Sequence, residues 1–167
     1  MFGQTRKSSM KLTMITTALF LSAGSAYASG THSGGHDEMM SIGAAGKMHA
    51  ITRTVSVDMM ETDDGNYIFE PGEMTFKAGE TVRFKIKNIG EQVHEFVMDE
   101  YAKNVEHKAL MEKFPEMEHD DPNAVRLEPG ESAEIIWTFA KPGKFEFACL
   151  IPGHYEAGMH GPLTVKK

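Results

Sequence analysis

The stretch that decides the fold and the chemistry of this chain reads Ala148-Cys149-Leu150-Ile151-Pro152-Gly153-His154-Tyr155-Glu156-Ala157-Gly158-Met159-His160-Gly161. It places the only cysteine, a histidine and a methionine at the spacing C-x4-H-x4-M, in a loop that proline and glycine residues keep turning. A thiolate, an imidazole and a thioether from one short loop form a sulfur-rich half-site, which favours copper and above all Cu(I). A second histidine from elsewhere in the chain would complete this site.

The amino terminus predicts export. Three basic residues precede an apolar run at 12–21, and the small-residue tripeptide Ala26-Tyr27-Ala28 follows, which is the layout of a cleaved secretory signal. A membrane anchor is the alternative, but the apolar run is too short to span a bilayer and contains threonines. We therefore expect residues 1–28 to be removed and the mature protein to be periplasmic, with no membrane insertion.

Length and charge narrow the functions that this chain can have. Residues 29–167 suffice for one ordinary domain with a real core. The formal net charge is −7, and residues 1–28 contribute three basic and no acidic residues, so the mature chain is more acidic still. This balance argues against nucleic acid and anionic membranes as partners. A lone cysteine in an oxidising compartment is a liability unless something occupies it, and a metal at Cys149 is the economical explanation.

Residues 29–49 read as a flexible tail, because small polar residues dominate and no helical or strand period is present. The tail contains scattered potential copper ligands, namely His32, His36, Met39, Met40, Met48 and His49. Two interpretations stay open. The tail is either a disordered leader without a function of its own or a mobile arm that captures copper.

From residue 50 onward the sequence predicts short strands. Val82, Phe84 and Ile86 alternate with polar residues, which gives one face for a core and one for water. Phe145 and Phe147 share a face with Cys149 by the period of two, so their strand should direct the thiol inward. About eight such strands, punctuated by Pro-Gly and Gly turns, predict an all-β antiparallel sandwich over residues 50–167.

An insertion at about 99–124 interrupts this β pattern and contains a predicted helix. Its candidate apolar face consists of Ala102, Val105, Ala109, Leu110 and Phe114. Further methionines and histidines occur in and beside the insertion, namely Met98, His107, Met111, Met117 and His119. We interpret the methionines as fillers of the core or surface. A second, weaker copper site is the minority hypothesis.

His94 is the candidate for the missing imidazole. It stands at the start of a predicted strand, directly after a turn at 88–91, with Val93 and Phe96 beside it. An ordinary strand-end histidine is the alternative on position alone. The assignment requires that the strand bearing His94 lie beside the Cys149 loop.

These residues resemble the cupredoxins, the small blue-copper proteins, over roughly residues 50–165. The resemblance rests on two motifs, Asn88-x5-His94-Glu95-Phe96 and Phe147-x-Cys149-x4-His154-x4-Met159-x-Gly161-Pro162. It implies a cupredoxin-like antiparallel Greek-key β-sandwich that binds one copper ion. It also implies that His94, Cys149 and His154 are the equatorial ligands and Met159 the weak axial one. With the exported Met/His tail, the chain is most similar to the periplasmic cupredoxins of bacterial copper resistance.

Two functions of different class fit this reading, and neither is enzymatic. The first is copper tolerance, in which the sandwich and the tail bind excess copper. The second is a soluble periplasmic electron shuttle, whose acidic surface would steer it toward a basic patch on a redox partner. A copper-transfer protein as partner is also left open.

Neighbouring functions fit the residues less well. A multicopper oxidase would need histidines beside the cysteine, where this chain has Ala148 and Leu150, and a binuclear copper centre would need two cysteines. Zinc prefers a harder fourth ligand than Met159. A Cys–His nucleophile would leave Met159 unexplained.

Overall fold

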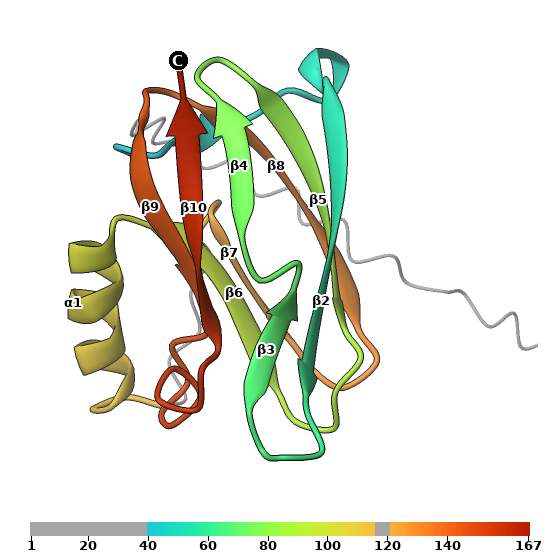
Figure 1. The fold of residues 1–167 in the computed structure, drawn as a ribbon, viewed down its shortest axis with the longest axis vertical. Helices are drawn as coiled ribbons and strands as arrows, with labels where there is room; N and C mark the ends of the chain where they lie inside the picture. The colour runs from blue at the N-terminus through green and yellow to red at the C-terminus, as the bar shows by residue number, and fades with distance from the viewer. Residues whose placement is uncertain (1–39, 116–120) are drawn as a thin grey trace, which may run out of the picture. The chain divides into compact units, whose positions relative to one another are not determined.

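In the computed structural model, residues 40–115 and 121–167 are described. They form two five-stranded sheets and one α-helix (Figure 1). The strands are β1 (Gly43–Ala45), β2 (Arg53–Glu61), β3 (Tyr67–Glu70), β4 (Met74–Lys77), β5 (Thr81–Asn88), β6 (His94–Asp99), β7 (Ala124–Leu127), β8 (Ser132–Phe139), β9 (Gly143–Ala148) and β10 (His160–Lys166). The helix α1 spans Tyr101–Met111, and a 3₁₀ turn covers Met48–Ala50. The signal sequence expected at 1–28 and the tail residues up to 39 lie outside the described residues.

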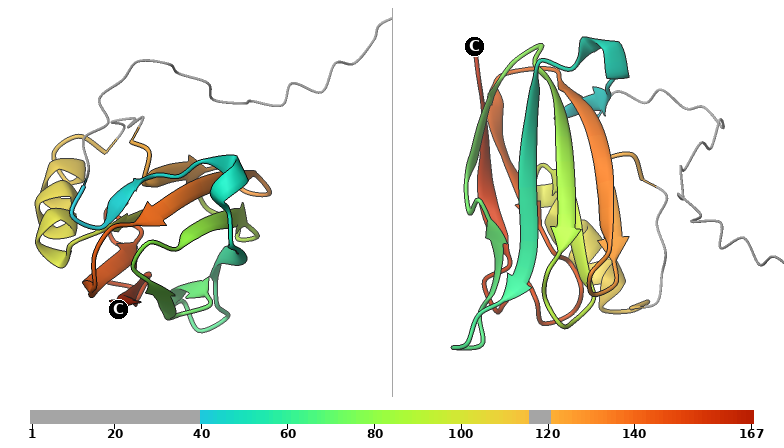
Figure 2. Two further views of the ribbon diagram at one scale, coloured as in Figure 1. Left: turned by 90° about the horizontal axis from the view of Figure 1, so that it is seen from above. Right: turned by 90° about the vertical axis from the view of Figure 1, so that its right-hand side faces the viewer.

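The sheets pack face to face as a sandwich (Figure 2). One sheet has the strand order β1-β8-β5-β2-β3 and the other β4-β10-β9-β6-β7. The predicted β-sandwich with a helix-containing insertion is confirmed. Its sheets are mixed, however, because β2 pairs with β5 and β10 with β4 in parallel, whereas the other pairs are antiparallel.

The core lies between the sheets and is rich in aromatic side chains. The alternation read in β5 is confirmed, since Val82, Phe84 and Ile86 are completely buried while Lys85 and Lys87 are exposed. Six phenylalanines from both sheets contact one another in this core, namely Phe69, Phe76, Phe84, Phe96, Phe139 and Phe147. Burial of this much apolar surface is the main source of stability for a sandwich of this size.

The folded part of the chain begins before residue 50, which corrects the predicted boundary. β1 pairs with β8, with Gly43 opposite Phe139 and Ala45 opposite Trp137, and Ile42 is completely buried in the core. Residues 40–49 therefore belong to the sandwich rather than to a flexible tail. The sequence conceals this strand because it has only three residues, all of them small, and no β-branched side chain.

The helix α1 lies between β6 and β7 in the chain and beside β9 in space (Figure 1). The face predicted to be buried is wrong, because Val105, Leu110 and Phe114 are exposed. Asn104 and Met111 are the buried residues of the helix. Asn104 donates a hydrogen bond of 3.0 Å from Nδ2 to Oε2 of the buried Glu146, and Met111 packs with Val97 and Leu150. A polar contact thus helps to orient this helix. The spacing of apolar residues, from which the buried face was predicted, contains no information about such a contact.

Within the described residues, no helix is long and apolar enough to cross a membrane.

Candidate metal centre

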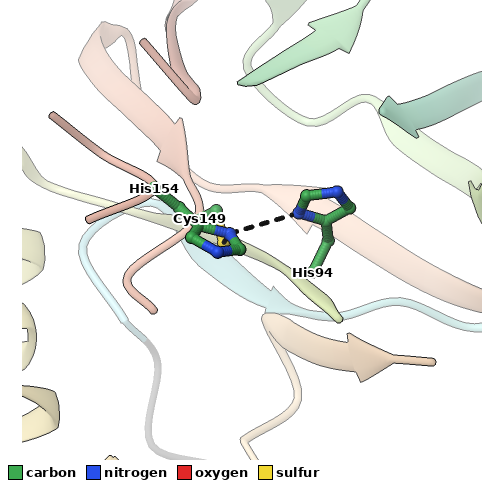
Figure 3. Close-up of side chains that lie close together, drawn as sticks. All are labelled: His94, Cys149 and His154. Carbon is green, nitrogen blue, oxygen red and sulfur yellow. Dashed lines mark hydrogen bonds between the residues drawn. The ribbon is translucent and has the colours of Figure 1, made fainter. Parts of the chain in front are cut away.

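Two segments distant in sequence, the start of β6 and the loop between β9 and β10, bring His94, Cys149 and His154 together (Figure 3). His94 is the first residue of β6, Cys149 directly follows β9, and His154 lies in the loop between β9 and β10. β6 pairs with β9, Val97 being opposite Ala148. The proximity of the His94 strand to the Cys149 loop, which the sequence required, is therefore confirmed. The loop lies at the end of the sandwich opposite the carboxyl terminus (Figure 1).

The donor atoms of these three side chains converge on one point. Nδ1 of His94 lies 3.3 Å from Nδ1 of His154, and Sγ of Cys149 lies 3.4 Å from the same His154 nitrogen. One donor atom from each residue lies within 4.8 Å of the other two, and all three residues are buried. Two ring nitrogens that face each other beside a sulfur form a donor set for a soft or borderline metal ion.

Met159 is buried in the same core and is tied to both loop residues through its backbone. Its N–H donates to the carbonyl of His154 at 3.0 Å, and its carbonyl accepts from the N–H of Cys149 at 2.9 Å. The loop thereby closes on itself around the donor atoms. These bonds fix the positions of all three loop residues relative to one another.

The sulfur of Cys149 is held from the neighbouring strand. The backbone N–H of Glu95 donates to Sγ at 3.3 Å, and the Glu95 carboxylate accepts from the N–H of Leu150 at 3.2 Å. Glu95 therefore joins the strand of His94 to the loop of Cys149 on both sides of the thiol. Hydrogen bonds to a thiolate lower its electron density and tune the metal bound to it.

Burial sets the protonation states of the metal-free site. Burial is the largest effect on Cys149 and raises the pKa of its thiol to about 12, so the group is a thiol at neutral pH. Burial, together with the neighbouring His94, lowers the pKa of His154 to about 4. Burial also lowers the pKa of His94, although Glu61 opposes this shift. Both rings are therefore neutral at pH 7 and can offer a nitrogen lone pair to a metal, while metal binding releases the thiol proton.

The lowered pKa of His154 predicts a pH-dependent stability of the metal-free protein. Between about pH 6.5 and 4 the unfolded chain binds a proton at His154 that the folded protein does not, so acid favours unfolding. This residue should contribute up to about 1.4 kcal/mol per pH unit to the free energy of unfolding. Denaturant titrations of metal-free protein at several pH values measure the slope. His154→Gln should make it shallower, and an unchanged slope would contradict the assignment.

Sequence reasoning missed Glu61 and Tyr67, which enclose the site. Tyr67 packs over both imidazoles, with ring centroids 4.5 Å from His154 and 5.7 Å from His94. Its backbone N–H donates to the carbonyl of Ala157 in the β9–β10 loop at 3.0 Å. Glu61 ends β2 and contacts the His94 ring. Both precede His94 by more than 25 positions and lie on strands of the other sheet, so only the tertiary fold brings them to the site.

The minority hypothesis of a second copper site in the insertion gains no support from the described part of the chain. There, the His94 cluster is the one group of three or more His, Cys, Asp or Glu side chains close enough to share an ion. Met98 and Met111 are buried, in keeping with their interpretation as fillers, and His107 lines a separate cavity of about 350 Å³. Met117 and His119 lie outside the described residues.

A two-sheet β-sandwich with a buried site of two imidazoles, one thiol and an adjacent methionine defines a protein of the mononuclear copper class. Residues 54–166 match the family of copper binding proteins described as the plastocyanin/azurin family. The chain belongs to this family. The resemblance noted in the sequence is therefore confirmed, and the donor set suits one copper ion.

Individual relatives agree with this assignment. The chain is 46% identical over 143 residues to the copper-resistant cuproprotein CopI of Rubrivivax gelatinosus, covering 86% of this chain and 82% of that protein. It is 41% identical over 131 residues to CopI of Pseudomonas aeruginosa, covering 61% of this chain and 72% of that protein. Among solved structures, dithionite-reduced auracyanin of Roseiflexus castenholzii is similar, with a TM-score of 0.57 and 27% identity over 70% of this chain and 99% of that one.

Proposed function

We propose that this protein is an exported, periplasmic copper protein of copper tolerance, in which His94, Cys149 and His154 bind one copper ion and Met159 is the weak axial ligand. The observation that carries the proposal is the convergence of three buried donor atoms within 4.8 Å of one another. The copper-resistant cuproproteins among its relatives support the role in tolerance. The secretory layout of residues 1–28 supports export.

The residues of this chain hold and shield the ion rather than process a substrate. His94 and His154 orient their ring nitrogens inward, Glu95 braces the sulfur, and Tyr67 covers the two rings against water. Copper bound there supplies a one-electron couple between Cu(I) and Cu(II). Ala148 and Leu150, which flank the cysteine, are buried apolar residues and offer no ligand to a further copper centre. We therefore propose no enzymatic turnover.

A single-electron shuttle is the second candidate function, and one observation favours it. Glu95 links the His94 strand to the Cys149 loop, and Tyr155 links that loop to β9 through a 2.9 Å hydrogen bond from its hydroxyl to Glu146. A site fixed in this way moves little when one electron is gained or lost. Such a shuttle would need a redox partner. Because this chain is acidic, we expect the partner to bind it through a basic surface of its own.

Growth of a copper-sensitive bacterial strain on graded copper separates the two functions. The wild-type protein should raise the tolerated copper concentration, whereas Cys149→Ser should give no protection because the thiolate ligand is gone. Protection that persists in Cys149→Ser would exclude this site from tolerance, and a wild-type protein that binds copper but never protects would favour the shuttle.

The same strain tests export and the tail. Cell fractionation with mass determination should find the protein in the periplasm without residues 1–28. A variant that lacks residues 29–39 keeps Ile42 and β1, so it removes potential ligands without removing part of the core. Loss of tolerance in this variant, with an unchanged copper spectrum, would assign copper capture to the tail, and full tolerance would exclude it.

A further inference from the structure

Glu61 contacts the edge of the His94 ring that faces away from the other donor atoms. Nε2 of His94 lies 3.0 Å from Oε1 of Glu61, whereas Nδ1 of the same ring lies 3.3 Å from Nδ1 of His154. The His94 side chain is completely buried and that of Glu61 is 17% exposed. A carboxylate can only accept a hydrogen bond, so Nε2 must carry the proton. Nδ1 is then left with a free lone pair that points toward the cluster.

The backbone of the β5–β6 loop holds this carboxylate in place. The N–H of Glu91 donates to Oε2 of Glu61 at 2.9 Å, and the N–H of Gln92 donates to Oε1 at 2.9 Å. The Nε2–H of His94 is a third donor to this carboxylate, at 3.0 Å from Oε1. The side chain therefore remains an anion with three N–H donors around it.

The loop is in turn fixed by Asn88, so the carboxylate has a rigid support. The Asn88 amide donates to the carbonyl of Leu127 at 3.0 Å and to that of Gln92 at 2.7 Å, and its oxygen accepts from the N–H of Gly90 at 2.9 Å. Asn88 is completely buried. The position of Glu61 is thus determined by groups that do not themselves touch the His94 ring.

Gly90 leaves the space that the carboxylate occupies. A Cβ atom at this position would lie 2.2 Å from Oε2 of Glu61 and 2.9 Å from its Cδ. Gly90 is not among the glycines with positive φ, so its backbone conformation does not require glycine. Room for Glu61 is the physical reason that the structure offers for a glycine at this position.

We propose that Glu61 is a positioning residue, which locks His94 in the Nε2–H tautomer and biases the bound copper toward Cu(II). This inference rests on the proposed copper site and assigns a determinant of its redox balance. A carboxylate that accepts a hydrogen bond from a ligating imidazole raises the basicity of that ligand and fixes its ring orientation. The negative charge of Glu61 favours Cu(II) over Cu(I), because opposite charges attract more strongly in the low dielectric constant of a buried site.

Two variants weaken this interaction in different ways. Glu61→Gln keeps the shape of the side chain and removes its charge, whereas Gly90→Ala leaves Glu61 unchanged and displaces its flexible carboxylate. Both should weaken Cu(II) binding at least about tenfold more than Cu(I) binding, within the range found for such partners of metal ligands. The midpoint potential should then rise by at least about 59 mV, the value that corresponds to a tenfold change for a one-electron couple. Competition with chelators for each oxidation state and redox titration of the copper absorption provide the two measurements.

Glu91→Gln is the matched control, because it removes a negative charge from an exposed side chain only three residues before His94. It keeps the backbone N–H that donates to Glu61. Its potential should stay close to that of the wild type. Thermal unfolding of the metal-free variants verifies that each one folds. If Glu61→Gln and Gly90→Ala shift the potential no more than Glu91→Gln does, the proposal is overturned.

An independent measurement needs no copper. ¹⁵N NMR of the metal-free wild-type protein should show the His94 ring protonated at Nε2, and protonation at Nδ1 would contradict the proposal. This result is separable from the proposed function. If the wild-type protein binds no copper, the proposed function is refuted. If it binds copper and Glu61→Gln changes neither the affinity nor the potential, only the role of Glu61 is refuted.

Discussion

Replacing Cys149 with serine should abolish the intense thiolate-to-copper absorption of the copper-loaded protein and lower its Cu(I) affinity by at least about 100-fold, the upper end of the losses seen for mere partners of metal ligands. Cys149 carries the only thiol in the chain, and its Sγ lies 3.4 Å from Nδ1 of His154. A serine hydroxyl is a hard donor and does not ionise at neutral pH, so it cannot replace a soft thiolate. Absorption spectra and chelator competition measure the two effects.

His160→Gln is the matched control for this variant. His160 follows Met159 directly, but its side chain is 41% exposed and its ring stacks on Tyr155 at a centroid distance of 4.2 Å. Its removal should leave the spectrum and the affinity unchanged. An intense visible band that survives in Cys149→Ser, or disappears in His160→Gln, would show that the ligand set is assigned wrongly.

Replacing Phe147 with alanine should lower the free energy of unfolding by about 3–5 kcal/mol. The ring is completely buried, contacts Phe69 edge-on at 5.2 Å and stacks on Phe96 at 5.9 Å between centroids. Its loss removes apolar contacts from both sheets and leaves a cavity two residues before Cys149. A typical domain is stable by about 5–15 kcal/mol, so this single change removes a large part of the total. Urea titration of the metal-free protein gives the value.

Phe114→Ala provides the comparison for Phe147→Ala, because it deletes the same ring from a position that is 58% exposed. Its effect should stay within about 0.5 kcal/mol. Equal losses from the two variants would mean that the aromatic cluster does not carry the stability assigned to it. A much larger loss from Phe114→Ala would show that this exposed ring is covered in solution.

The convergence of His94, Cys149 and His154 could be predicted because most of its signals are local. Cys149, His154 and Met159 lie close together in sequence, within one loop. Phe145, Phe147 and Cys149 occur at every second position, which predicts that the thiol points inward with the two rings. His94 followed from a strand-end position and from the need for a second imidazole. Glu61 carried no such signal, because its contact with His94 depends on how β2 lies beside the β5–β6 loop.

The errors in the fold have a common physical cause. β1 consists of Gly43 and two alanines, and its strand conformation comes from pairing with β8 rather than from its own side chains. The buried face of α1 contains Asn104, because its side chain donates a hydrogen bond to the carboxylate of Glu146 on β9. In both places a tertiary contact decides what local sequence preference leaves open.

The loop around His154 should also determine the rates at which a metal ion binds and is released. His94 and Cys149 are completely buried, and Tyr67 lies over the rings and is bonded to Ala157 in the loop. We therefore expect a bound ion to exchange through opening of this loop, which is a local unfolding event with its own free energy. Residence time at such a site is set by the frequency of opening, and an external chelator in excess would strip the metal at a rate independent of its concentration. The same burial should slow both the binding and the loss of copper, which suits a protein that retains the ion.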